Sequence, residues 1–79
     1  MTRARRGVTA REFIRALHED GFQLQRSRGS HRVYRHRDGR RMVTAFHSLA
    51  STFPIGTLNG MIQDAGWTGE DLIRLGLAG

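Results

Sequence analysis

The chain has 79 residues, with 13 basic residues against 7 acidic ones, a formal charge of +6 and no cysteine. A chain of this length forms one small domain and buries too little surface to enclose a large cofactor. The absence of cysteine excludes disulfides, thiolate metal sites and a cysteine nucleophile. Because no apolar run reaches the roughly 20 residues that span a bilayer and no secretory signal is recognisable, we expect a cytoplasmic protein without membrane association.

The positive charge is concentrated in the first half of the chain. All 13 basic residues are arginine, and 12 of them lie in residues 1–41 together with 4 acidic residues, a net charge of +8. Residues 42–79 carry one arginine and three acidic residues, a net charge of −2. A compositional bias of the genome explains arginine in place of lysine, but not this clustering. The planar arginine fork matches phosphate, so nucleic acid is the leading partner class.

The first elements in chain order are a basic tail and a helix. Residues 1–8 show no periodicity, and we expect them to form a mobile tail ahead of a single domain over residues 9–79. Thr9 and Glu12 have the spacing of a capping box, which predicts a helix from Ala10 to Asp20. The glycine that follows this helix is placed to end it in the left-handed conformation.

The chain then changes to the period of strands. Residues 22–25 alternate between apolar and polar side chains, which predicts a strand with one buried face. A turn at residues 28–30 leads to a second strand over residues 31–36. The Asp-Gly pair at residues 38–39 is a strong hairpin signal, and a third strand follows around residues 40–46. We therefore expect a three-stranded antiparallel meander.

The second strand leaves two choices for its buried face. If Val33 faces the core, His31 and Arg35 lie on the core side with it. If Tyr34 faces the core, these two polar residues point outward. We favour Tyr34, because this choice buries neither the histidine nor the arginine.

The last third of the chain is predicted to be helical after a loop. Residues 47–53 form the loop, and apolar residues at helical spacing predict a helix over residues 54–65, capped by Gly66. Trp67 is placed to fold back onto its last turn. A second capping pattern opens a short helix over residues 68–75. The order indicates an α+β fold of the double-stranded-RNA-binding-domain type, α-β-β-β-α, with a three-stranded antiparallel sheet and helices on one face.

His31 is the candidate for chemistry because of its neighbours. It follows Gly29-Ser30, a turn whose backbone amides can face an anion. RNA strand scission requires a base that takes the 2′-hydroxyl proton and positive charge that stabilises the pentacoordinate phosphate. We therefore take His31 as the candidate catalytic residue. The candidate RNA-binding residues are those around it, namely Arg26, Arg28, Gly29, Ser30, Arg32 and Arg35. The same set also fits a surface that binds RNA without cleaving it.

The other histidines are weaker candidates. We expect His18 to be an exposed helix residue and His36 a solvated turn residue. His47 follows the third strand and is a secondary candidate for the site. His31 and His36 are five residues apart, which places them on opposite faces of one strand, so we expect no metal site and no cofactor.

An ordered set of short motifs carries a resemblance that covers roughly residues 9–75. They are Asp20-Gly21-Phe22, Arg28-Gly29-Ser30-His31, Tyr34-Arg35-His36, Asp38-Gly39-Arg40, Gly56-Thr57-Leu58 and Ala65-Gly66-Trp67. Together they resemble the HicA family, the small messenger-RNA interferase toxins of type II toxin–antitoxin systems. The resemblance implies a double-stranded-RNA-binding-like fold, cleavage of mRNA, and neutralisation by a HicB-type antitoxin that covers the active face. It also places His31 at the position of the family's catalytic histidine.

The resemblance is not complete. Residues 45–47 read Ala-Phe-His where the family commonly has Val-Pro-x-His, and His47 matches the histidine of that pattern. The leading hypothesis is a metal-independent endoribonuclease toxin that is a monomer when free of its antitoxin. The alternatives are a noncatalytic RNA-binding module of the same fold and an adaptor whose basic face meets an acidic protein.

Overall fold

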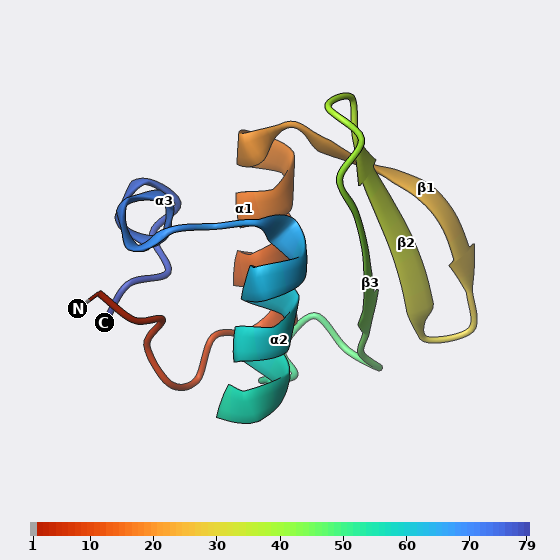
Figure 1. Cartoon of the computed structure of the whole chain (residues 1–79). Helices are drawn as coiled ribbons and strands as arrows, with labels where there is room; N and C mark the ends of the chain where they lie inside the picture. Colours follow the sequence, from red (N-terminus) through yellow and green to blue (C-terminus); the bar gives the residue numbers. More distant parts are fainter. Residues whose placement is uncertain (1) are drawn as a thin grey trace.

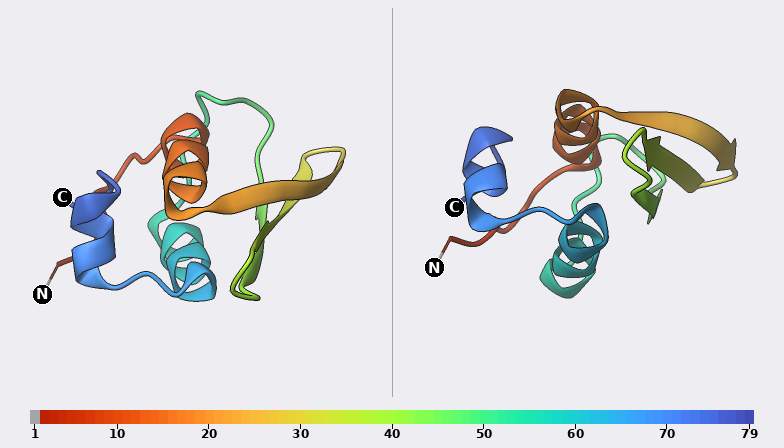
Figure 2. Two further views of the ribbon diagram at one scale, coloured as in Figure 1. Left: turned by 90° about the horizontal axis from the view of Figure 1, so that it is seen from above. Right: turned by 45° about the horizontal axis from the view of Figure 1, so that its top comes forward.

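A computed structural model describes residues 2–79, and in this range the chain forms three helices and one three-stranded sheet (Figure 1). The elements in order are α1 (Ala10–Asp20), β1 (Phe22–Arg28), β2 (His31–His36), β3 (Arg41–Ala45), α2 (Ile55–Ala65) and α3 (Gly69–Arg74). The strands are antiparallel in the order β1-β2-β3. Helices α1 and α2 cover one face of the sheet, and α3 lies beyond them, away from the strands (Figures 1 and 2). The predicted α+β fold is confirmed.

Helix α1 begins and ends as its local sequence predicts. The Thr9 hydroxyl accepts the backbone N–H of Glu12 at 3.2 Å, and the Glu12 carboxylate accepts the backbone N–H of Thr9 at 3.0 Å. Gly21 ends the helix with φ of 100°. A Cβ at this position would also lie 2.9 Å from Nε2 of His36, so both the backbone conformation and the close approach require glycine.

The core lies between the helices and the covered face of the sheet. Phe13 of α1 is at its centre, with its ring centroid 5.4 Å from that of Trp67 and 5.8 Å from that of Phe53. Tyr34 belongs to this core, which confirms the favoured face of β2. Val33 is also buried, but on the opposite face and outside the core cluster.

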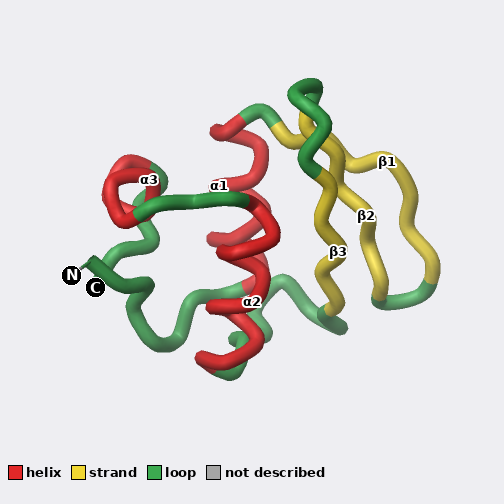
Figure 3. Tube along the Cα trace, viewed as in Figure 1, coloured by secondary structure: helices red, strands yellow, loops and turns green. Residues whose placement is uncertain are grey.

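The helical end of the chain forms as predicted. Pro54 precedes α2, and Gly66 ends α2 with φ of 73°. The backbone N–H of Trp67 donates to the carbonyl of Ile62 at 3.1 Å and so folds back onto the last turn, while the indole packs against Phe13 and Phe22. Thr68 caps α3 (Figure 3) in a second capping box.

The expectation of a mobile N-terminal tail is wrong for residues 3–5. The backbone N–H of Arg5 donates to the Leu77 carbonyl at 2.9 Å, and that of Gly79 donates to the Arg3 carbonyl at 3.1 Å. Ala4 is 9% exposed and belongs to the core. The Arg5 guanidinium forms an ion pair with Glu12. No local pattern predicts this pairing, because it joins the two ends of the chain. Met1 lies outside the described residues.

Strand β1 also departs from its predicted pattern. Only Phe22 is buried in this strand, and Leu24, the second apolar residue of the alternation, is 49% exposed. The strand is at the edge of the sheet and runs out past the layer of helices (Figures 1 and 2). The prediction of a continuous buried face is therefore wrong beyond Phe22, because there is no helix opposite Leu24 to cover it.

The Asp20 carboxylate joins three segments that are distant in sequence. It accepts hydrogen bonds from Arg40 Nη1 at 3.0 Å, Trp67 Nε1 at 2.9 Å and Arg74 Nη2 at 2.9 Å. Its side chain is 12% exposed. Burial alone raises the pKa of the Asp20 carboxyl, but these donors outweigh burial and hold the pKa below its ordinary value of 3.8. The ionised carboxylate thus links the end of α1 to the β2–β3 turn, to the segment after α2 and to α3.

We predict that Asp20→Asn lowers the free energy of unfolding at pH 7 by about 2 kcal/mol, because it removes the charge that three donors share. The folded-state pKa of Asp20 is lowered, so its contribution is present at neutral pH and is lost as the pH falls through that lowered pKa. The stability difference between wild type and variant should therefore shrink in acid. Urea denaturation at pH 7 and at pH 3 measures both values, and an equal difference at the two pH values would contradict the assignment.

Thr44 carries a buried polar group without a partner in the described residues. It lies in β3 opposite Arg32, is 2% exposed, and its Oγ1 has no hydrogen-bond partner within residues 2–79. An unpaired buried hydroxyl destabilises the folded state. We predict that Thr44→Val raises the free energy of unfolding by about 1 kcal/mol. Thermal denaturation measures the gain, and Thr57→Val on the exposed side of α2 is the control that should change little.

Candidate nucleic-acid interface

The face of the sheet opposite the helices is uncovered, and we refer to it as the open face. Side chains of a strand alternate between the two faces. In β2, Tyr34 faces the core, so its neighbours Val33 and Arg35 lie on the open face, and His31 shares that face with them. His31 is exposed at the first position of the strand. The predicted outward position of this histidine is confirmed.

A bulge in β1 brings two arginines to the same face. Leu24 pairs with Tyr34, but the next pair along the ladder is Arg26 with Val33, so Gln25 is an extra residue. Strict alternation would place Arg26 on the core side with Phe22. The extra residue reverses the alternation and turns Arg26 to the open face. The bulge was not predicted, because no residue pattern within residues 22–28 indicates where an extra residue interrupts the pairing.

His31 lies in a cleft on the open face, which we call the His31 cleft. It has a volume of about 270 Å³ and is lined by Arg26, Arg28, His31 and Val33. Arg28 is paired with His31 across the two strands, and Arg26 with Val33. The cleft therefore holds one imidazole and two guanidinium groups around an apolar floor. The two guanidinium groups can bind a phosphate, and the imidazole can accept or donate a proton beside it.

The turn that leads into β2 positions His31. Gly29 has φ of 60°, and nothing lies within 4 Å of the place a Cβ would occupy, so the backbone conformation alone requires glycine here. The Ser30 carbonyl accepts the backbone N–H of Phe46 at 3.2 Å and Arg32 Nη1 at 3.2 Å. These bonds tie the turn to the end of β3 and hold the start of β2 in place.

Comparison with known families places this geometry in context. The family model of the HicA toxin of bacterial toxin–antitoxin systems matches residues 10–67 of the 79-residue chain. The chain belongs to the HicA toxin family. The match includes all three strands, the bulge and the His31 cleft. The protein is therefore a toxin component, and its membership implies an antitoxin partner. No curated protein matches the chain significantly.

The predicted RNA-binding arginines of this HicA toxin do not all share one face. Arg35 lies on the open face with His31, but Arg32 lies on the helix side of β2, where its Cζ stands 4.1 Å from the centroid of the Phe46 ring. Arg32 thus supports the turn and the end of β3. Arg41 is a residue that sequence reasoning missed. It is exposed, pairs with Arg35 across β2 and β3, and shares the open face. Register between strands, which only the fold provides, identifies it.

The remaining histidines divide between structure and site. His18 is exposed on α1, as expected, with its ring 6.0 Å from that of Tyr34. The expectation of a solvated His36 is wrong. Its side chain is 15% exposed, with Nε2 2.6 Å from the Asp20 carbonyl and Nδ1 accepting the backbone N–H of Asp38 at 3.1 Å. His47 is exposed and lies two residues beyond Ala45, the β3 partner of His31.

Two further properties of the toxin concern metals and membranes. Within the described residues, no group of three or more histidine, cysteine, aspartate or glutamate side chains is placed to hold a metal ion. No helix in residues 2–79 is long and apolar enough to cross a bilayer.

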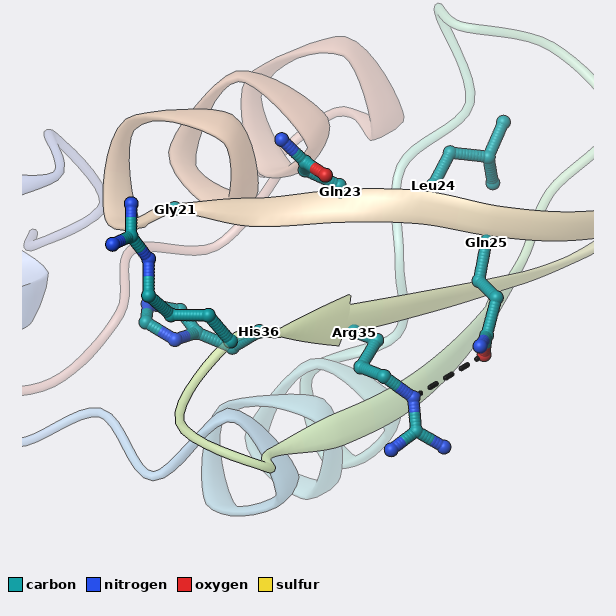
Figure 4. Close-up of a pocket in the computed structure, with 7 residues that line it drawn as sticks. Gly21, Gln23, Leu24, Gln25, Arg35 and His36 are labelled. Atoms are coloured by element: carbon teal, nitrogen blue, oxygen red, sulfur yellow. Dashed lines mark hydrogen bonds between the residues drawn. The ribbon is translucent and has the colours of Figure 1, made fainter.

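A second depression lies at the other end of the β1–β2 pair, and we call it the Arg35 hollow (Figure 4). Its volume is about 560 Å³, and its lining consists of Gly21, Gln23, Leu24, Gln25, Arg35, His36 and Arg37. Arg35 Nε donates to Gln25 Oε1 in a long hydrogen bond of 3.5 Å. Figure 4 shows these two side chains pointing toward each other across the strands. Neither charge nor spacing in the sequence indicates this depression.

Proposed function

We propose that this HicA toxin is a metal-independent endoribonuclease that cleaves mRNA, with His31 as its general acid/base. The observation that supports it is the His31 cleft, where an exposed imidazole lies with Arg26 and Arg28 on an uncovered sheet face. An open face admits a flexible single strand without a deep pocket. The arginines supply positive charge at the phosphate, so the chemistry needs no metal ion.

The cleavage step balances with the groups in the cleft. His31 takes the proton of the 2′-hydroxyl, and the 2′-oxygen forms a bond to the adjacent phosphorus. Arg26 and Arg28 stabilise the added negative charge of the pentacoordinate phosphate. The bond from phosphorus to the 5′-oxygen then breaks, and the departing oxygen receives the proton that His31 had taken. The net reaction moves one proton between two oxygens and leaves a 2′,3′-cyclic phosphate.

The proposal also includes the partner and the location. A HicB-type antitoxin would neutralise the toxin by covering the open face, and the arginines there would favour acidic groups on that partner. RNA and the antitoxin would then compete for one surface. We propose a cytoplasmic toxin that is a monomer when free of its antitoxin. The second candidate function is RNA binding without cleavage, since the same arginines serve a binding surface equally well.

We predict that His31→Ala lowers the cleavage rate by a factor of about 10² to 10⁴, the usual contribution of a general acid/base. RNA affinity and thermal stability should change little, because the side chain is exposed. The assay follows fragments of an mRNA incubated with purified toxin in excess chelator. His18→Ala is the matched control, an exposed histidine on α1 that should leave cleavage unchanged.

Three results would count against this proposal. Cleavage by His31→Ala at the wild-type rate would remove the histidine from the mechanism. Loss of cleavage together with loss of the fold would give the residue a structural role instead. Wild-type protein that retards RNA in a gel and leaves it intact would establish the noncatalytic alternative.

We predict that replacing both Arg26 and Arg28 with glutamine weakens RNA binding at every sequence tested. Each phosphate contact to single-stranded RNA contributes about 0.7 to the slope of log affinity against log salt, so the slope should fall by about 1.4. Fluorescence anisotropy across a salt series measures it. The matched control replaces Arg3 and Arg6, two exposed arginines of the N-terminal segment, with glutamine. An equal change in both double variants would show that charge alone, and not the cleft, sets the affinity.

A further inference from the structure

We propose that the Arg35 hollow binds a guanine base of the RNA strand and gives this toxin a sequence preference away from the scissile phosphate. This inference rests on the proposed function, since it assumes that RNA lies on the open face. It assigns a ligand to a depression that the cleavage chemistry does not use. The residues that carry it are Arg35 and Gln25.

The Arg35 hollow and the His31 cleft are neighbours along the β1–β2 pair. Val33 lines the cleft, and Arg35, two residues further along β2 on the same face, lines the hollow. On β1 the neighbouring residues Gln25 and Arg26 belong to the hollow and the cleft respectively. At about 3.3 Å per strand residue, His31 and Arg35 are about 13 Å apart along β2. An RNA strand whose scissile phosphate lies at His31 can therefore place the base of a nearby nucleotide in the Arg35 hollow.

The hydrogen bonding of Arg35 leaves one edge of its guanidinium available to a ligand. Its Nε is directed to Gln25 Oε1, and Figure 4 shows its two Nη atoms pointing away from Gln25. A guanidinium held by one nitrogen presents its other edge as two parallel donors. Two such donors match O6 and N7 of guanine, the commonest base-specific contact of arginine. Bases of single-stranded RNA leave this edge accessible.

The bulge in β1 explains why the Gln25 side chain can reach the Arg35 hollow. Gln25 is the residue without a partner in the β1–β2 ladder, so its side chain is free of the strict alternation of the strand. Gln25 Oε1 lies 3.5 Å from Arg35 Nε, so the amide stands directly beside the guanidinium. Its amide group then supplies a donor and an acceptor beside the guanidinium. The bulge thus turns Arg26 toward the cleft and directs Gln25 to the hollow.

The test uses the full chain with His31→Ala, so that RNA is bound without being cut. The probes are fluorescent oligouridines that carry a single guanosine at successive positions, and the readout is affinity by anisotropy. We expect a guanosine at one position to raise affinity by about tenfold over oligouridine, as one bidentate contact provides. Adding Arg35→Lys should reduce this preference to less than about twofold, because lysine keeps the charge and loses the paired donors. Replacing the guanosine with 7-deazaguanosine should weaken the preference in the same way.

The control adds Arg11→Lys, an exposed arginine on α1, which should keep the guanosine preference. A preference that Arg35→Lys leaves intact would overturn the inference. A uniform loss of affinity for all oligomers would show that Arg35 contacts phosphate only. Failure of the proposed function has a different signature, because wild-type protein would then leave mRNA intact while the guanosine preference of the bound state persists.

Discussion

The sheet has one face that must be buried, and α1 and α2 bury it. The apolar side chains of this face require a covering layer that removes them from water. Helices α1 and α2 cover this face, and α3 lies away from the strands. The other face of the sheet therefore remains open. The whole proposed site lies on that open face. The protein needs no pocket enclosed by a second layer, because its candidate chemistry takes place on a surface that RNA can reach along its length.

Eight of the 13 arginines fall into two groups by what they contact. One group stabilises the fold through ion pairs, carbonyls or an aromatic ring, and consists of Arg5, Arg32, Arg40 and Arg74. The other group shares the open face with His31 and consists of Arg26, Arg28, Arg35 and Arg41. A net charge of +6 therefore overstates how much arginine is available to RNA. Arg5 of the basic N-terminal segment is in the first group, and the backbone of this segment pairs with the C-terminal end of the chain.

Features with a local cause could be predicted from the sequence. The bounds of α1 follow from the Thr9 capping box and the glycine at its end, and β2 follows from the two turns that flank it. Features that depend on segments distant in the sequence could not be predicted. Leu24 is exposed because no helix lies opposite it, and His36 is enclosed because α1 ends beside the β2–β3 turn. In each case the residue's own neighbours in sequence are compatible with either outcome.

The order of the elements, the family resemblance and the choice of His31 as the leading candidate follow from the amino-acid sequence alone. Caps, turns and hydrophobic periods act over a few residues, so they can be recognised without the fold. Which arginines share a face with that histidine depends instead on how the strands pair. The bulge at Gln25 turned Arg26 toward it, while strand alternation placed Arg32 on the core side. The physical reason is that strand register depends on pairing between strands, and one extra residue reverses every side chain that follows it.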